Sequence, residues 1–336
     1  MQRHIVVHGA GSVGCYLGGC LAATGASVKL LGRPRLQAEV RERGMLLTDL
    51  HGGRCQLQPE AIEFVSEAEV LAEADLVLVT VKSLATATAA NELKRNARPG
   101  TLVISFQNGI GNASLLRDAL PQRTVLAGMV PFNVLHQAPG HWHRGTEGGL
   151  HVARHAGLQP YLQTFTDAGL PLTEHDDMTG VLWGKLLLNL NNAINALAGV
   201  PLREELQQRA YRRCLALCIE EGLSALRAAG IAPAQLARIP TQRMPGLLRL
   251  PDWLFVRLAK RMLMIDPLAR SSMWEDLERG RRTEIDYLNG EIVRLADINS
   301  LAAPANTRVA ALVKVAEQGG RRNWSGEELW RELRQR

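Results

Sequence analysis

The most constraining feature of this sequence is a cluster of glycines between its first apolar segment and a helical stretch. The letters GAGSVG at residues 9–14 follow IVV at residues 5–7 and open a segment with helical periodicity. In that context the first glycine permits a tight turn, the second lets the backbone approach a pyrophosphate, and the third lets helix and strand pack closely. A phosphate there would meet the positive end of the helix and its unpaired amides. The motif predicts a dinucleotide site at Gly9, Ala10, Gly11, Ser12, Val13 and Gly14, with a purely structural turn as the alternative.

The end of the second predicted strand carries arginine where NAD enzymes usually carry an acidic residue. Residues 32–35 read GRPR, and arginine at this place favours the 2′-phosphate of NADP. Arg33 is the better candidate, because Pro34 fixes the backbone around it and Arg35 lies further along the chain. The alternative is a solvated surface arginine.

Two later strand ends are also candidates for ligand contacts, because ligands of open α/β sheets lie beyond the carboxyl ends of the strands. Lys82 follows the third predicted strand and Asn108 follows the fourth. Either could reach the cofactor or a keto group. The alternatives are a surface lysine and a turn asparagine that precedes glycine.

The order of the elements predicts an α/β N-terminal Rossmann domain, doubly wound around a mainly parallel sheet, followed by an all-helical C-terminal domain. Short, less regular strands between about residues 126 and 152 are expected to complete the sheet. Helical periodicity prevails after residue 176, so we place an NADP-binding domain at 1–175 and a helical substrate and catalytic domain at 176–330. The expected strands are His4–His8, Ser27–Leu31, Leu76–Val81 and Leu102–Phe106.

Composition narrows the class of protein. A length of 336 residues suits two domains that share a cleft, and 46% hydrophobic with 21% charged residues is typical of a globular chain. The net charge of +6 comes from scattered arginines rather than a nucleic-acid arm. We read no signal peptide and no membrane span, and the five cysteines form no CxxC pair. A cytoplasmic protein with reduced thiols, acting on an anionic small molecule, fits these observations best.

A second candidate site lies in the helical half. Residues 181–197, read as one helix, are apolar on several sides and should be buried, yet Lys185, Asn189 and Asn192 share one face. A lysine on a buried helix must find a partner, reach water or change its ionisation, which suggests a site. The alternative is a lysine that extends to solvent beside structural asparagines. Glu284 lies beside an apolar helical stripe and could pair with Lys185, although a solvated helix charge is the default interpretation.

Taken together, these segments resemble the ketopantoate reductase family over nearly the whole chain. The order and spacing of the matching elements carry the resemblance, and Arg33 adds to it. The elements are GAGSVG at 9–14, QNGIG at 107–111, LWGKLLLN at 182–189, SSMWED at 271–276 and TEIDYLNG at 283–290.

The resemblance implies NADPH-dependent reduction of the C2 carbonyl of 2-dehydropantoate to (R)-pantoate, for pantothenate and coenzyme A synthesis. It implies that Lys185 protonates the new alkoxide or polarises the carbonyl, and that Glu284 positions lysine and substrate. Asn189 and Ser272 match positions that hold the substrate hydroxyl and carboxylate, and Asn192 is a further candidate there. Asn108 and Lys82 match positions near the nicotinamide.

Two departures from the family pattern leave the substrate open. Ala193 stands where a second asparagine is expected, with Asn192 and Asn195 nearby, and Ala269 stands where some members carry asparagine. Both positions concern the substrate rather than the cofactor. An NADPH-dependent reductase of another branched 2-keto acid is therefore the first alternative.

Other classes of function have weaker support. A non-catalytic NADP sensor would bind cofactor without turnover. A metal enzyme would draw on the histidine pairs at 141 and 143 and at 151 and 155, but no acidic or cysteine partner completes a ligand set, so we expect no metal. We expect a small-molecule 2-keto acid as partner, no nucleic acid and no membrane. A homodimer is compatible with the sequence.

Overall fold

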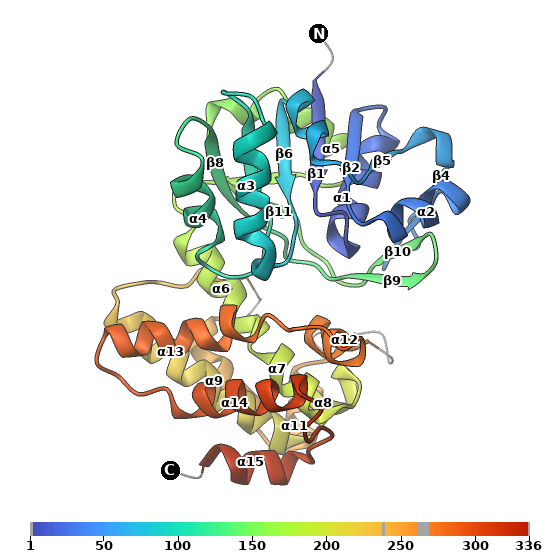
Figure 1. The fold of residues 1–336 in the computed structure, drawn as a ribbon. Coiled ribbons are helices and arrows are strands. Elements are labelled where there is room, and N and C mark those ends of the chain that lie inside the picture. Colours follow the sequence, from blue (N-terminus) through green and yellow to red (C-terminus); the bar gives the residue numbers. More distant parts are fainter. Residues whose placement is uncertain (1–2, 237–238, 261–268, 335–336) are drawn as a thin grey trace. The chain divides into compact units, whose positions relative to one another are not determined.

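The structure is a computed structural model that describes residues 3–236, 239–260 and 269–334. The chain divides into two compact units, Met1–Met178 and Thr179–Arg336 (Figure 1). The N-terminal unit is α/β and the C-terminal unit is helical, so the predicted fold class is confirmed.

An eight-stranded sheet forms the centre of the N-terminal unit. Its strand order is β12-β11-β8-β7-β6-β1-β2-β5, and every pairing is parallel except that of β11 with β8. Because the order reverses beside β1, the carboxyl ends of β1 and β6 are the expected place for a ligand. The strands are β1 (His4–His8), β2 (Ser27–Leu31), β5 (Glu63–Val65), β6 (Leu76–Val79), β7 (Leu102–Ser105), β8 (Thr124–Met129), β11 (Leu150–Ala153) and β12 (Leu172–His175).

Alternation within the strands builds a core on each face of this sheet. In β1, Ile5 and Val7 join one buried cluster while Val6 joins the other, as the two-residue period of a strand requires. Helices α3 and α4 cover the face that contains Val6 (Figure 1). The helices and turns of this unit are α1 (Ser12–Ala23), α2 (Pro34–Arg43), η1 (Pro59–Ala61), η2 (Ala68–Glu73), η3 (Ser83–Ala85), α3 (Thr86–Asn96), α4 (Asn112–Ala119), η4 (Ala156–Leu158) and α5 (Leu162–Asp167).

The expectation that the strands between 126 and 152 all complete one sheet is wrong. β8 and β11 join the main sheet, but β9 (Val134–Ala138) and β10 (His141–Arg144) pair with β3 (Met45–Asp49) and β4 (Arg54–Leu57) in a separate four-stranded sheet. The physical reason is that β10 pairs in parallel with β3, a strand from a distant part of the chain. Local sequence patterns do not reveal such a pairing. The predicted third and fourth strands also end slightly early, at Val79 and Ser105.

The C-terminal unit contains only helices and turns among its described residues, 179–236, 239–260 and 269–334. Its longest helix, α9, packs against α10, α13 and α15. None of the helices in the described part of the chain could cross a membrane, because each is too short or too polar. The elements are α6 (Thr179–Asn189), α7 (Asn191–Ala198), α8 (Leu202–Gln207), α9 (Arg209–Ala228), η5 (Thr241–Arg243), α10 (Met244–Leu248), α11 (Asp252–Leu258), α12 (Ser272–Glu278), η6 (Ile285–Tyr287), α13 (Asn289–Ile298), α14 (Pro304–Glu317) and α15 (Gly326–Arg334).

Candidate active site

The glycine turn between β1 and α1 is held by close backbone approaches. Gly9 has a φ of +109°, and a Cβ there would lie 2.5 Å from the backbone nitrogen of Val81. A Cβ on Gly14 would lie 2.5 Å from the Gly9 carbonyl oxygen and 2.6 Å from the Thr80 Oγ1. The Thr80 hydroxyl also donates to the Gly9 carbonyl over 2.8 Å. Gly9 and Gly14 therefore fix the turn against the neighbouring strand β6.

Gly11 lies in a different environment, although it belongs to the same motif. The nearest atom to a Cβ placed there is the Gly9 carbonyl oxygen at 3.9 Å, so internal packing does not demand glycine. Gly11 is the N-cap residue of α1 and, having no side chain, makes no side-chain hydrogen bond to the first amides of the helix. Open space over helix amides is what an approaching phosphate requires, so the loop of Gly9, Ala10, Gly11, Ser12, Val13 and Gly14 fits a dinucleotide.

Arg33 lies at the end of β2, beside this loop. A Cβ on the preceding Gly32 would lie 2.8 Å from the Ala10 Cβ, which shows how closely the strand end approaches the glycine turn. Arg33 is exposed, and no ion pair involving it is found within the described part of the chain. Arg35, by contrast, pairs with Glu39 at 3.3 Å. Of the two arginines, Arg33 is therefore the one that no carboxylate neutralises within the described residues.

Lys82 and Asn108 follow β6 and β7, as predicted, and a hydrogen-bond network joins these strand ends. The Ser83 hydroxyl donates to the Asn108 carbonyl over 2.8 Å. Asn112 donates through Nδ2 to that same carbonyl at 2.5 Å and to the Ser83 hydroxyl at 3.0 Å. Lys82, the residue before Ser83, is exposed. The network thus fixes the backbone from which Lys82 and Asn108 extend.

Sequence reasoning missed the residues that support this network. Gln107 and Thr86 are buried, and Gln107 donates to the Thr86 hydroxyl over 2.7 Å, while Thr86 donates to the Asn112 Oδ1 over 2.7 Å. Gln107 also donates to the Val81 carbonyl over 3.1 Å. Buried amides and hydroxyls that are mutually satisfied rigidify a site. Polar residues directly after apolar strands were the available signal, since Gln107 follows the buried β7.

Lys185 lies on α6, whose packing requires glycine at two positions before the lysine, one and five residues earlier. Cβ atoms on Gly180 and Gly184 would lie 2.6 and 2.5 Å from the carbonyl oxygens of Ala232 and Ala234. Part of the Lys185 side chain is exposed, yet burial by the surrounding protein lowers its pKa from 10.5 to about 8. Desolvation penalises the charged form of an amine, and that penalty sets the direction of the shift. The lysine is thus able to exchange a proton near neutral pH.

The single helix expected over 181–197 is two helices. α6 ends at Asn189 and α7 begins at Asn191, with Leu190 in a turn between them. Asn189 is buried on α6, beside the turn, and Asn192 is half-buried on α7. The break was not visible in the apolar pattern, which continues through it.

Glu284 precedes the short turn η6 and is 9% exposed, so the default interpretation as a solvated helix charge is wrong. Hydrogen bonds fix the backbone on both sides of Glu284. Thr283 donates both its backbone N–H and its hydroxyl to the Glu317 Oε1, each over 2.7 Å, and Ile285 donates its N–H to the Thr283 hydroxyl. The predicted pairing of Glu284 with Lys185 stays a prediction.

Ser272 is the first residue of α12 and is exposed, while the preceding Ser271 is buried and caps the helix. The Ser271 hydroxyl accepts from the Trp274 N–H at 3.1 Å and donates to the Asn192 carbonyl over 3.0 Å. α12 is therefore tied to α7, and Ser272 lies one residue from the junction. Ser271 belongs to the SSMWED element, but its capping role was not predicted, although a serine before a helical run is a recognised cap signal.

The histidine pairs have hydrogen-bonding roles. His141 and His143 both bond to the Thr48 hydroxyl at 2.8 Å, and His151 bonds to His175 at 2.8 Å. Within residues 3–236, 239–260 and 269–334, no three His, Cys, Asp or Glu side chains gather where they could hold a metal ion.

Comparison with known families agrees with this geometry. Residues 5–157 match the family model described as Ketopantoate reductase PanE/ApbA, and residues 177–317 match the model of its C-terminal part. A 2-dehydropantoate 2-reductase of Halobacterium salinarum is 30% identical over 323 residues, which cover 94% of this chain and 99% of the relative.

Solved structures show the same likeness. A PanE/ApbA family ketopantoate reductase from Ralstonia eutropha JMP134 superposes with a TM-score of 0.80 at 31% identity, covering 94% of this chain and 99% of that one. A D-mandelate dehydrogenase with NADH and anilino(oxo)acetate shares the fold with a TM-score of 0.78 at 19% identity and the same coverage. Matches to both parts of the family, together with a relative of 30% identity along almost its entire length, lead to one conclusion. The chain belongs to the ketopantoate reductase PanE/ApbA family.

Proposed function

We propose that this protein is an NADPH-dependent 2-dehydropantoate 2-reductase that forms (R)-pantoate for pantothenate and coenzyme A synthesis in the cytoplasm. The observation that carries the proposal is Lys185, a lysine on a family-specific helix whose pKa is lowered to about 8 by burial. Reduction of a ketone requires a proton donor for the new alkoxide, and such a donor works best when its pKa lies near the operating pH.

The N-terminal unit supplies the cofactor site in this proposal. The open space at Gly11 and the uncapped start of α1 suit the pyrophosphate, and exposed Arg33 suits a 2′-phosphate. Lys82 and Asn108, whose backbone is fixed at the ends of β6 and β7, are assigned to the nicotinamide end. NADPH, when bound, supplies the hydride that reduces the substrate carbonyl.

The C-terminal unit supplies the proton and holds the keto acid. Lys185 donates its proton to the substrate oxygen, and the buried Glu284 orients lysine and substrate. Asn189, Asn192 and Ser272 are assigned to the substrate's hydroxyl and carboxylate. Hydrogen-bond donors aimed at the developing alkoxide lower the barrier, because they stabilise charge that appears only in the transition state.

A reductase of another branched 2-keto acid is the second candidate. The observation that favours it is Ala193, which is fully buried and offers no hydrogen bond where the family pattern has asparagine. Ala269, the second departure, donates nothing from its side chain either, and its carbonyl accepts from the Leu202 N–H. Both positions are assigned to the substrate rather than to the cofactor, so the two candidates differ only in substrate.

NADPH oxidation by the purified protein tests both candidates. We expect rapid turnover with 2-dehydropantoate, slower turnover with 2-oxoisovalerate and pyruvate, and loss of turnover in Lys185→Ala. Turnover with only another keto acid would select the second candidate. No oxidation with any keto acid, despite NADPH binding by calorimetry, would contradict both and favour an NADP sensor.

A further inference from the structure

A buried chain of hydrogen bonds connects α8, α7 and α12 in the C-terminal unit. Asn195, Glu205 and Ser271 are each no more than 1% exposed. Asn195 donates from Nδ2 to the Glu205 Oε2 over 2.7 Å and to the Val200 carbonyl over 3.0 Å. Its Oδ1 accepts from the Ser271 N–H at 2.8 Å. Both amide N–H groups and the oxygen of Asn195 are therefore used, and the backbone donor at Ser271 defines which end of the amide is which.

The chain ends at residues assigned to the substrate. Ser271 directly precedes Ser272, and the Ser271 hydroxyl donates to the carbonyl of Asn192. Asn195 lies one turn after Asn192 on α7. Removing the Asn195 side chain would leave the Ser271 N–H without its acceptor. That hydrogen bond holds the start of α12 against α7. The relative position of Asn192 and Ser272 thus depends on Asn195.

Glu205 completes the arrangement as a neutral partner. Burial raises its pKa to about 8, against opposing hydrogen bonds from Asn195 and Asn191. A neutral acid in this place needs an acceptor for its own proton, and the buried Asn191 Oδ1 accepts no hydrogen bond from the described residues. Reversing the Asn191 amide would present that oxygen to the acid, and amide orientation is assigned from such networks. A glutamine could replace the neutral acid at little cost, because it keeps an acceptor toward Asn195.

We propose that Asn195, held by Glu205, is a positioning residue that sets Ser272 and Asn192 for recognition of the keto acid. This inference rests on the proposed function. It assigns specificity for the substrate to a junction between helices that does not itself touch the substrate. The same role bears on Ala193, which stands where the family pattern has asparagine. Asn195, two residues later, acts on the substrate through the backbone of α12 rather than through a direct contact.

The test separates keto-acid recognition from general damage. For Asn195→Ala we expect the KM for the keto acid to rise about tenfold or more, with the KM for NADPH changed less than twofold, since the cofactor residues lie in the other unit. Ser271→Ala, which keeps the N–H but loses the cap, should raise the same KM by a smaller factor. Glu205→Gln should keep both KM values within about twofold of the wild type, whereas Glu205→Ala should resemble Asn195→Ala.

Glu221→Gln is the matched control. Glu221 is another carboxylate with a raised pKa in the same unit, and it accepts the Ala305 and Asn306 N–H groups at the start of α14. Its substitution should alter thermal stability without a selective rise in the KM for the keto acid. Equal effects of Glu221→Gln and Asn195→Ala on that KM would overturn the proposal, as would an unchanged KM in Asn195→Ala.

Hydrogen exchange supplies a readout that is independent of turnover. Asn195→Ala should increase amide exchange in a peptide covering residues 269–278 more than elsewhere in the unit, because the Ser271 N–H loses its acceptor. Uniformly faster exchange would indicate general loosening and would contradict the positioning role. If the wild type reduces no keto acid, the proposed function fails, and the link to recognition fails with it. If the wild type is active and only the selective KM effect is missing, the positioning role alone fails.

Discussion

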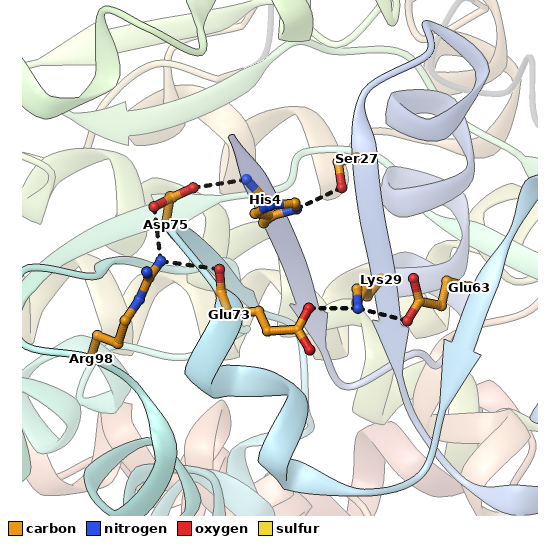
Figure 2. Close-up of polar contacts among 7 residues, drawn as sticks. All are labelled: His4, Ser27, Lys29, Glu63, Glu73, Asp75 and Arg98. Carbon is orange, nitrogen blue, oxygen red and sulfur yellow. Dashed lines mark hydrogen bonds and ion pairs between the residues drawn. The ribbon is translucent and has the colours of Figure 1, made fainter. Parts of the chain in front are cut away.

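The two ends of the parallel sheet in the N-terminal unit differ in the polar groups that they carry. At the amino ends of the strands, charges are paired: Asp75 accepts from the His4 N–H and from Arg98, and Lys29 bridges Glu63 and Glu73 (Figure 2). At the carboxyl ends, neutral amides and hydroxyls form the network described above, and the cations Arg33 and Lys82 are exposed. Arg33 forms no ion pair within the described part of the chain, so its charge is accessible to an anionic ligand, whereas the charges of Lys29 and Asp75 are already neutralised by protein partners.

The same contrast separates two lysines. Lys29 donates hydrogen bonds to the carboxylates of Glu63 and Glu73, and these bonds raise its pKa, whereas burial lowers the pKa of Lys185. A lysine stabilised as a cation holds its proton tightly, and a desolvated lysine can give it up.

Replacing the desolvated lysine should have the largest effect on activity. Lys185→Met should lower kcat/KM for the keto acid by about 10²- to 10⁴-fold, the usual contribution of a general acid. It should also raise the melting temperature, because a buried ammonium destabilises the folded state below its unfolded pKa of 10.5. Lys29→Met is the control and should leave kcat/KM within about twofold. Steady-state kinetics and thermal unfolding measure both effects. A similar loss of kcat/KM in Lys185→Met and Lys29→Met would show that the two lysines do not differ in function.

Arg33 should decide between the two nicotinamide cofactors. Arg33→Ala should raise the KM for NADPH by roughly 10- to 100-fold, as expected for a lost charge-assisted bond to phosphate, and change the KM for NADH little. Arg35→Ala, which breaks the pair with Glu39, is the control. Kinetics with both cofactors measure the preference. An equal rise in the KM values for NADPH and NADH in Arg33→Ala would show that the arginine does not recognise the 2′-phosphate.

The pH dependence should report the ionisation of Lys185. Only the protonated amine can donate a proton, so log(kcat/KM) should be level below the pKa of about 8 and fall about tenfold per pH unit above it. The folding linkage has the opposite sign: the folded pKa lies below the unfolded one, so stability should rise between pH 8 and 10.5. A rate profile that continues unchanged to pH 10 would exclude Lys185 as the proton donor.

The glycines of one motif should respond differently to a methyl group. Gly11→Ala should fold normally, since the added Cβ meets nothing closer than 3.9 Å, but it should raise the KM for NADPH about tenfold by occupying ligand space. Gly14→Ala should lower the melting temperature instead, because its Cβ would lie 2.5 Å from a backbone oxygen. Thermal unfolding and cofactor titration distinguish the two effects. A destabilised Gly11→Ala with normal cofactor affinity would reverse these assignments.

The smallest effect is expected at the amino ends of the strands. Asp75→Asn weakens the bond to Arg98 and should reduce the free energy of unfolding by no more than about 1 kcal/mol, as is usual for half-exposed ion pairs. Steady-state kinetics should be unchanged within error. A selective loss of cofactor affinity in this variant would mean that the two ends of the sheet are not separate in function.

Local patterns in the sequence predicted much of the N-terminal unit. β1 and β2 have the predicted bounds, because alternating β-branched residues bounded by glycine and proline leave few other structures. The separate sheet of β3, β4, β9 and β10 was not predictable in this way, since its parallel contact joins segments about a hundred residues apart. The break at Leu190 was hidden for another reason: apolar residues on both sides of it maintain one helical period.

Three features could be recognised without any structure: the glycine turn, the arginine after β2 and the helix that carries the lysine. Each is encoded within a few neighbouring residues, where backbone geometry and helical spacing act directly. The packed fold was needed to show that Lys185 is desolvated, that Glu284 is buried and that Asn195 joins Glu205 to Ser271. Ionisation and hydrogen-bond partners depend on atoms contributed by distant segments, and these are brought together only when the helices pack.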